Sequence, residues 1–281
     1  MRKMTEQLIE EFADYLINEE KSKATLEKYT RDIRSFFQWL KGREFDKAVV
    51  LEYKNSIMEK YAPASVNSML SSLNSFFSFN NWHECRVKTL KIQRQSFSSG
   101  AKELSKDEYE RLLKAALNQN NERLYMLMQT ICSTGIRVSE LEYITVDAIR
   151  TGRACIYCKG KNRCVLLSPK LCQMLIKYAR KHEISRGSIF VSKNGRPLSR
   201  INIWADMKML CKDANVDAAK VFPHNLRHLF ARTYYSLHKD ISRLADILGH
   251  SSVNTTRIYT MESGKEHVRQ MQMLGLLHLQ I

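Results

Sequence analysis

Apolar residues recur every three or four positions through the first eighty residues, and this period is typical of helices that bury one face. Ser22 is a candidate N-cap, Pro63 suits a first helical position, and Gly42 favours a helix end. The pattern therefore predicts helices over residues 5–18, 23–40, 46–61 and 63–80. Together they form a four-helix unit of about 85 residues.

The helical period is lost in residues 88–102, which contain Ser, Gly and four basic residues but no acidic ones. A segment of this composition is typical of a linker between domains. We therefore expect a helical domain over residues 1–90, a basic linker over 91–102 and a second domain over 103–281.

Helical patterns resume after the linker. Ser105 and Glu108 have the spacing of a capping box, which predicts a helix start. A second helix is expected from Glu122 to about Ser133, and another is expected to begin near Arg137.

The period changes to two across residues 151–168, which predicts a β-hairpin with the basic tip "KGKNR". Residues 187–192, "GSIFVS", are a further strand candidate, and helices return from about residue 202. Cys155 and Cys158 would lie on opposite faces of a strand, so we interpret them as small core residues rather than zinc ligands. The second domain is thus expected to be mainly helical with one small sheet.

The composition adds a strong charge imbalance. The chain has 281 residues and is 44% hydrophobic, enough for a packed core in both domains. It contains 45 Lys and Arg against 29 Asp and Glu, a formal net charge of +16. A charge of this size repels itself in the folded state and usually has an anionic partner. Nucleic acid is the first candidate, ahead of an acidic membrane surface or a basic protein without such a partner.

Neither an export signal nor a membrane span is expected. The segment "MRKMTEQLIEEF" has no apolar run after its basic residues. No window approaches the roughly 20 apolar residues of a spanning helix. The seven cysteines, an odd number, fit a reducing compartment. We therefore expect a cytoplasmic protein, associated with the nucleoid if its partner is DNA.

Two short motifs combine arginine with a polar partner. In "PHNLRH", Pro223 favours a helix start, and His224 and Arg227 share a face of its first turn. Unpaired N–H groups and the helix dipole favour an anion there. In "STGIRVSEL", Arg137 follows a tight turn, and Glu140 is spaced to orient it through a charge-assisted hydrogen bond. Taken alone, the first motif is also typical of a surface His–Arg pair on a basic protein, and the second of a helical salt bridge.

The third motif is "LGHSSVNTTRIYT". Gly249 is predicted to end a helix, His250 to lie in the connection, and Ser251 or Ser252 to cap the next helix. Tyr259 then falls about two turns into that helix. Taken alone, Tyr259 is equally typical of an aromatic core residue.

These boxes resemble those of the tyrosine recombinases, or phage integrase family. "TGIRVSEL" is similar to the first Arg box, "HNLRH" to the H-x-x-R-H box, and "LGHSSVNTTRIYT" to the box ending in the nucleophilic Tyr. "TLEKYTRDIRSFFQWL" resembles the first domain, and the two-domain layout resembles Xer-like and mobile-element integrases. The resemblance covers nearly the whole chain. It implies a mainly α (α+β) fold, in which a SAM-like core-binding domain and a mixed catalytic domain clamp duplex DNA.

The resemblance also implies the roles of five residues in a site-specific DNA recombinase. Arg137 and Arg227 would hold the scissile phosphate. Tyr259 would attack the phosphorus and form a 3′-phosphotyrosyl link, with His224 as its general base. His250 would hydrogen-bond the phosphate. The implied reaction uses neither ATP nor a metal or other cofactor.

One more catalytic residue, Lys159, is implied by the resemblance, and two residues, Glu140 and His228, receive supporting roles. Lys159, in the hairpin tip, would protonate the 5′-oxygen leaving group. Cys158 stands where the family commonly has Gly, and the loop looks one residue shorter, so Lys161 is the alternative. Glu140 would orient the first arginine, and His228 would support the segment that carries the tyrosine.

Two other functions remain open at this point. A type IB topoisomerase uses closely similar chemistry without a partner site, and a DNA-binding regulator could keep the scaffold without the reaction. The two-domain size favours the recombinase over the first. The occupied catalytic positions favour it over the second.

The segment 264–281 carries one more apolar pattern. Its residues Val268, Met271, Leu274, Leu277 and Ile281 form a single stripe at helical spacing. An exposed stripe of this kind needs a groove. The groove is expected either on the chain's own catalytic domain or on a neighbouring recombinase. The family resemblance implies the second, with a dimer on each DNA site and a tetramer in synapsis.

Overall fold

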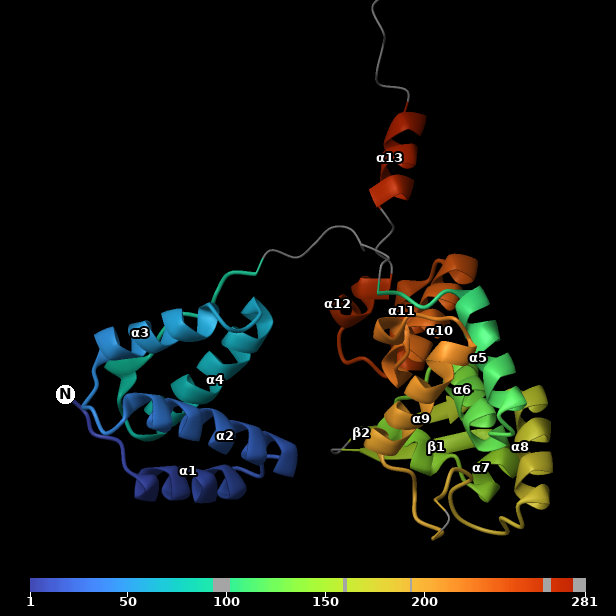
Figure 1. Ribbon diagram of the computed structural model, residues 1–281, viewed down its shortest axis with the longest axis horizontal. Coiled ribbons are helices and arrows are strands. Elements are labelled where there is room, and N and C mark those ends of the chain that lie inside the picture. The colour runs from blue at the N-terminus through green and yellow to red at the C-terminus, as the bar shows by residue number, and fades with distance from the viewer. Residues whose placement is uncertain (93–101, 159–160, 193, 260–263, 275–281) are drawn as a thin grey trace, which may run out of the picture. The chain divides into compact units, whose positions relative to one another are not determined.

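The computed structural model describes residues 1–92, 102–158, 161–192, 194–259 and 264–274 (Figure 1). The chain divides into two compact units, a first unit of Met1–Gln95 and a second unit of Ser96–Ile281. The division falls inside the segment 91–102, where a linker is predicted. Among the described helices, none is long and apolar enough to cross a membrane.

The predicted helices of the first unit are all present. They are α1 (Glu6–Asn18), α2 (Lys23–Leu40), α3 (Lys47–Met58) and α4 (Pro63–Phe79), followed by the short 3-10 helix η1 (His83–Cys85). Ser22 caps α2 by accepting a hydrogen bond from the Thr25 amide at 3.3 Å, as predicted. The left-handed backbone that ends α2 starts at Lys41, one residue before the expected stop at Gly42.

The core of the first unit is aromatic. Phe12, Phe36, Phe45, Phe76 and Phe77 are all fully buried. Their rings meet mainly edge to face, with Phe12 and Phe76 centred 5.3 Å apart at 85°. Edge-to-face contacts add to the hydrophobic gain because the positive ring edge meets the negative ring face.

Two asparagines fasten the segment that follows η1 to α4. The Asn74 side chain accepts from the Val87 amide and donates to its carbonyl, at 3.0 and 2.8 Å. Asn67 does the same for Leu90, at 2.7 and 2.9 Å. The first unit therefore extends through residue 90, although the helical period has already ended at residue 88.

The second unit is helical around one hairpin. Its helices are α5 (Lys106–Asn118), α6 (Glu122–Thr134), α7 (Val146–Thr151), α8 (Pro169–Lys181), α9 (Arg200–Asp213), α10 (Pro223–His238), α11 (Ile241–Leu248), α12 (Val253–Thr256) and α13 (Gly264–Met273). Its 3-10 helices are η2 (Val138–Tyr143), η3 (Ala218–Lys220) and η4 (Arg257–Tyr259). The capping box of Ser105 and Glu108 is formed. Helix α6 packs against α5, α8, α9 and α10, so it lies at the centre of the core.

The predicted hairpin is present, with a shorter tip. Strands β1 (Arg153–Cys158) and β2 (Lys161–Leu166) pair antiparallel, with Ala154 opposite Val165 and Ile156 opposite Arg163. Residues 161–163, expected in the tip, thus belong to β2. The tip residues 159 and 160 lie outside the described residues.

Other expectations for the second unit are wrong. The segment beginning at Arg137 forms the 3-10 helix η2 rather than an α-helix. Residues 187–192 form isolated bridges at Ser188 and Val191 instead of a strand, although they still contribute buried residues to the core. Cys155 is exposed and lies opposite the exposed Cys164, so it is not a core residue. Within the described residues, no three metal-ligating side chains are grouped as a metal site.

Candidate active site

Gly135 turns the chain from α6 toward the first arginine. It has a φ of 64°, and a Cβ there would lie 2.5 Å from the ring of Phe230. Both the conformation and the close ring demand glycine. The turn delivers Arg137 to the N-cap of η2, where its backbone amide and its Nη1 each donate to the Glu140 carboxylate at 2.8 Å. The predicted orienting contact between these two residues is therefore formed.

Helix α10 delivers the second arginine. Pro223 occupies the first helical turn, as predicted, and Arg227 points inward with 1% of its surface exposed. Its Nη1 donates to the Gly135 carbonyl at 2.5 Å, and its Nη2 donates to the Leu248 carbonyl at 2.8 Å. Burial, followed by the nearby positive charge of Arg137, lowers the pKa of Arg227 to about 10. A buried cation of this kind is costly unless its donors are bound, and main-chain carbonyls bind them here.

The connection after α11 holds the third box. Gly249 has a φ of 63° and ends α11, as predicted. His250 Nε2 lies 2.9 Å from Arg227 Nη2, and its Nδ1 lies 2.8 Å from Thr256 Oγ1. Because a guanidinium only donates, Nε2 accepts and the imidazole proton sits on Nδ1. Burial, followed by the charge of Arg227, lowers the pKa of His250 to about 4 and keeps the ring neutral.

Tyr259 lies in the same cluster. Ser252 caps α12, but α12 ends at Thr256, and Tyr259 closes the 3-10 helix η4 rather than standing two turns into a helix. The tyrosine is 4% exposed, and its phenol lies close enough to Arg227 to affect the pKa of that guanidinium. Its ring packs edge to face on His228 at 4.9 Å and stacks beside His250 at 6.1 Å.

Two histidines of α10, His224 and His228, form a row that reaches Tyr259. The rings of His224 and His228 are 4.4 Å apart, so His228 contacts both His224 and Tyr259. Burial, followed by His224, lowers the pKa of His228 to about 4, and burial with the charge of Arg227 also lowers the pKa of His224. His228 Nε2 is buried and has no hydrogen-bond partner among the described residues.

A cleft of about 290 Å³ adjoins this cluster on the side of His224 and Arg227. Its charged and polar lining comes from Arg137, Ser139, Arg200, His224 and Arg227, and its apolar side includes Trp204; His228, His250 and Tyr259 are not among its lining residues. Of the two arginines of the motifs, Arg137 is the accessible one, with 39% of its side chain exposed. Arg200 and Trp204 lie at the start of α9, and neither belongs to a motif that pointed to the site.

The sequence reasoning also missed Arg163, which lies beside the two arginines. Its Nη2 donates to Glu140 Oε2 at 2.6 Å, and its side chain is only 15% exposed. The alternation of β2 is the signal that could have found it, because Arg163 shares a strand face with the buried Val165. The structure does not describe the side chain of either lysine candidate. Lys159 and the side chain of Lys161 lie outside the described residues.

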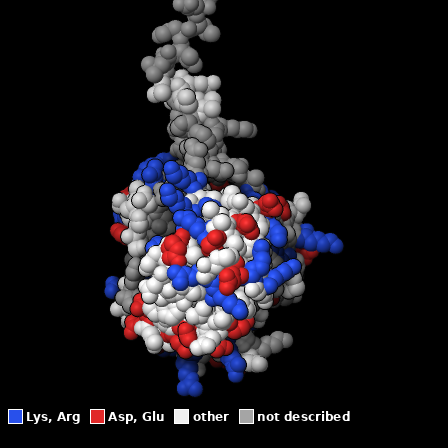
Figure 2. Space-filling model, turned by 90° about the vertical axis from the view of Figure 1, so that its left-hand side faces the viewer, with Lys and Arg blue, Asp and Glu red and all other residues white. Residues whose placement is uncertain are grey.

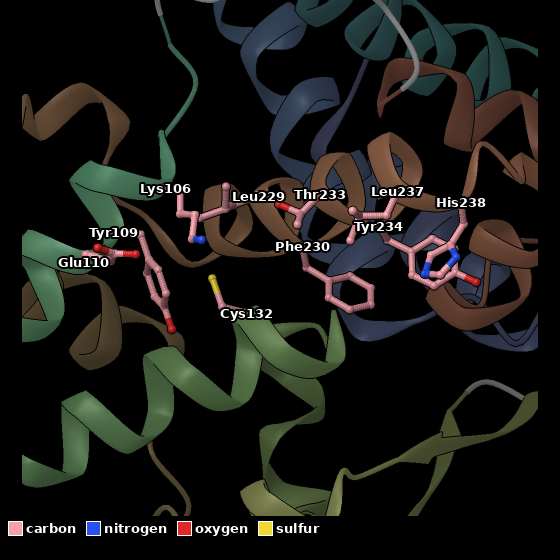
Figure 3. A pocket seen from close by; sticks show the side chains of 10 residues that line it. All are labelled: Lys106, Tyr109, Glu110, Cys132, Leu229, Phe230, Thr233, Tyr234, Leu237 and His238. Atoms are coloured by element: carbon pink, nitrogen blue, oxygen red, sulfur yellow. The ribbon is translucent and has the colours of Figure 1, made fainter.

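A second pocket lies apart from these motifs, between α5, α6 and α10 (Figure 3). It measures about 290 Å³. Its apolar lining is Tyr109, Cys132, Leu229, Phe230, Tyr234 and Leu237. Burial raises the pKa of the Cys132 thiol to about 12, so this cysteine is an unreactive part of the wall.

Both halves of the chain match family descriptions. Residues 9–84 match the "Phage integrase, N-terminal SAM-like domain", and residues 102–266 match the "Phage integrase family". The chain is 29% identical over 276 residues to the tyrosine recombinase XerA of Thermococcus kodakarensis, covering 95% of this chain and 94% of that protein.

Two solved structures share the fold. A lambda integrase dimer bound to a COC′ core site is similar with a TM-score of 0.74 and 18% identity, over 92% of this chain and 95% of that one. A lambda integrase tetramer bound to a Holliday junction gives a TM-score of 0.72 and 19% identity, over 90% of this chain and 76% of that one.

Proposed function

The chain belongs to the phage integrase family and is a tyrosine recombinase, an enzyme that breaks and rejoins DNA, and we propose that Tyr259 is its nucleophile. The observation that carries the proposal is the meeting of two distant motifs at one buried phenol. Arg227 and His228 come from one motif and His250 from the box that also carries Tyr259, and all three lie beside Tyr259. A phenol held between a guanidinium and two imidazoles has the partners that nucleophilic attack on a phosphate requires.

The proposed reaction exchanges one phosphoester for another. The Tyr259 oxygen forms a bond to the phosphorus while the bond from phosphorus to the 5′-oxygen breaks. The phenolic proton passes to a base, and the departing 5′-oxygen takes up a proton. The resulting 3′-phosphotyrosyl link conserves the energy of the broken phosphodiester. A 5′-hydroxyl from a second strand can therefore reverse the step and complete integration, excision or resolution.

The two arginines are proposed to hold the phosphate from different depths. Arg137 is the more accessible of these two guanidiniums, with its orientation set by Glu140. Arg227 uses two Nη groups on carbonyls and His250, which leaves its remaining N–H groups for the phosphate and Tyr259. Preorganised charge of this kind stabilises negative charge as it develops in the transition state.

The histidines share the proton chemistry. His224 lines the cleft beside Arg227 and is our candidate general base, with His228 packed between it and Tyr259. His250 is neutral with its proton on Nδ1, so its Nε2 has to release Arg227 and also gain a proton before it donates to a phosphate. Lys159, with Lys161 as the alternative, remains the proposed acid for the leaving 5′-oxygen.

Covalent trapping tests the nucleophile. A binding site is first selected from randomised duplexes, and a panel of these duplexes is nicked at successive positions so that the cleaved strand end diffuses away. The wild-type protein should form an adduct that survives denaturing electrophoresis. Tyr259→Phe should bind the same duplex and form none. An adduct with the Phe variant would place the nucleophile elsewhere, and no adduct with either protein would favour a silent DNA-binding regulator.

Double-stranded DNA and further copies of the chain are the proposed partners. We propose a dimer on each site and a tetramer in synapsis, assembled through residues 264–281. Val268 and Met271 in α13, and Leu274 directly after it, are each more than half exposed. The apolar pocket in Figure 3 offers lining of matching character, which supports docking of this stripe on a neighbouring copy.

Truncation after Ser263 tests the docking. The truncated protein should bind a single site normally but lose synapsis and strand exchange. Leu237→Lys, at an exposed rim position of the pocket, should give the same loss in the full-length chain. Recombination of two sites at the full-length rate by the truncated protein would reject docking on a neighbour, and failure of that protein to fold would indicate packing on its own domain.

A further inference from the structure

Arginine side chains donate hydrogen bonds to three consecutive main-chain carbonyls, those of residues 247–249, at the C-terminal end of α11. The donors are, in the same order, Nη1 of Arg163 at 3.0 Å, Nη2 of Arg227 at 2.8 Å and Nη2 of Arg137 at 3.4 Å. The last carbonyls of a helix lack partners within it and carry the negative end of its dipole. These guanidiniums therefore cap α11 and hold the connection that begins at His250.

Arg163 also reaches the other side of the site. Its Nη2 donates to Glu140 Oε2 at 2.6 Å, and the same oxygen accepts from the Arg137 backbone amide at 2.8 Å. The second oxygen of Glu140 accepts from Arg137 Nη1 at 2.8 Å. One guanidinium from β2 thus ties the carboxylate that orients Arg137 to the helix end that precedes His250.

The fit around Arg163 is tight. A Cβ on Gly249 would lie 2.5 Å from the Arg163 Cδ and 2.8 Å from its Nη1. The side chain is pinned at both Nη groups, so it cannot swing away without losing a hydrogen bond. Gly249 therefore serves two purposes, since its left-handed backbone ends α11 and its missing side chain admits Arg163.

We propose that Arg163 is a positioning residue of the recombination reaction, which keeps Arg137 and His250 in place for the phosphate. Its planar fork suits this task because it bridges two acceptors at a fixed separation, which an ammonium group cannot do. Direct contact with DNA is a poor alternative, because the side chain is 15% exposed and both Nη groups are bound. The inference rests on the proposed function, in which Arg137 and His250 contact the phosphate.

Arg163→Lys is the test, with Arg153→Lys as the matched control. Arg153→Lys is the same chemical change, made at an exposed position of the same hairpin. Single-turnover adduct formation on the selected suicide duplex is measured against protein concentration. Arg163→Lys should slow the saturated rate roughly 10- to 100-fold, the size expected when reacting groups are slightly misplaced. Its half-saturating concentration should stay within about 3-fold of wild type, as should both values for the control.

Amide hydrogen exchange without DNA supplies a readout that does not depend on activity. The amides of Gly249 and His250 donate to Asp246 and Ala245, both at 3.0 Å. Both amides should exchange faster in Arg163→Lys than in the wild type. In Arg153→Lys they should exchange at the wild-type rate. Should Arg163→Lys fail to fold, Gly249→Ala tests the same contact from the other side and should give the same slow adduct and fast exchange.

The outcomes separate the two proposals. A wild-type adduct rate in Arg163→Lys overturns the positioning role, whatever the exchange shows. A raised half-saturating concentration with an unchanged rate also overturns it, because Arg163 would then bind DNA. If the wild-type protein forms no adduct, the proposed function fails, and the exchange of Gly249 and His250 still decides whether Arg163 holds the end of α11.

Discussion

In the first unit the largest fully buried side chains are phenylalanines, whereas in the second unit the largest is the charged side chain of Arg227. The first unit buries Asp32 and Ser72 as well, but Lys28 binds both of them at 2.8 Å. Arg227 has main-chain carbonyls and a neutral histidine as partners instead. Among the described residues no carboxylate forms an ion pair with Arg227, so its positive charge is held ready for an anion.

The charge of the chain divides in the same way. Residues 1–95 contain 16 Lys and Arg against 13 Asp and Glu, while residues 96–281 contain 29 against 16. On the face shown in Figure 2, acidic side chains are scattered among the basic ones. The first unit is therefore stabilised by its own core, whereas the second unit carries an excess charge, for which DNA is the proposed partner.

The largest expected effect is on DNA affinity. If the chain neutralises roughly 8 phosphates, affinity should fall with a log–log salt slope of about −7, or roughly 10⁴-fold from about 50 to about 200 mM salt. Arg200→Gln, in the cleft of the second unit, should reduce the steepness of that slope by about 1. The measurement is a fluorescence anisotropy titration on duplex DNA. A slope near zero would contradict the assignment of the excess charge to DNA.

A core change in the first unit should affect stability alone. Phe36 is fully buried among Phe45, Phe77 and Tyr53. Phe36→Ala should lower the free energy of unfolding of this unit by about 3–5 kcal/mol, from lost burial and the cavity left behind. Denaturant unfolding can be followed by Trp fluorescence. An equal shift in the transition of the second unit would show that the two cores are not independent.

Arg227→Met should show the opposite pattern, with a much larger effect on activity than on stability. The pKa of Arg227 is lowered to about 10, so the folded state disfavours the charged form and the charge costs stability at neutral pH. Replacement by an apolar chain of similar length removes that cost but leaves the carbonyls of Gly135 and Leu248 without their donor, so the free energy of unfolding should fall by only about 1–2 kcal/mol. Adduct formation should fall by roughly 10²–10³-fold, the cost of losing a preorganised donor. Loss of stability comparable to that in Phe36→Ala would refute this contrast.

The smallest expected effect is on the pH dependence of stability. The pKa values of His228 and His250 are both lowered to about 4, below the unfolded value of about 6.5. Folding therefore disfavours their protonation, and the second unit should lose stability as the pH falls from about 6.5 toward 4. Solvent screening limits the loss to about 1 kcal/mol. His228→Phe keeps the ring contact and should flatten the dependence measured by denaturant titration. A wild-type profile that is flat over this range would count against the buried neutral histidines.

Local patterns determined much of this protein. Helical period, caps and Pro63 and Pro223 predicted the four helices of the first unit, the start of α10 and the capping box of α5, and the structure confirms them. These features depend on interactions within a few residues, which a sequence displays directly. The family resemblance also agrees with the matches to both domains. The motifs that carry the resemblance are short and local, so the sequence displays them directly.

Only the tertiary structure decided how the site is assembled. The end of α12, the 3-10 helix that carries Tyr259 and the place of Arg163 beside Glu140 all depend on residues far apart in the chain. Arg163 was expected in a basic hairpin tip, since its charge suggested solvent. Its actual partners are a carboxylate 23 residues before it and a carbonyl 84 residues after it. A buried charge is stabilised by such distant partners, and their positions exist only once the helices have packed.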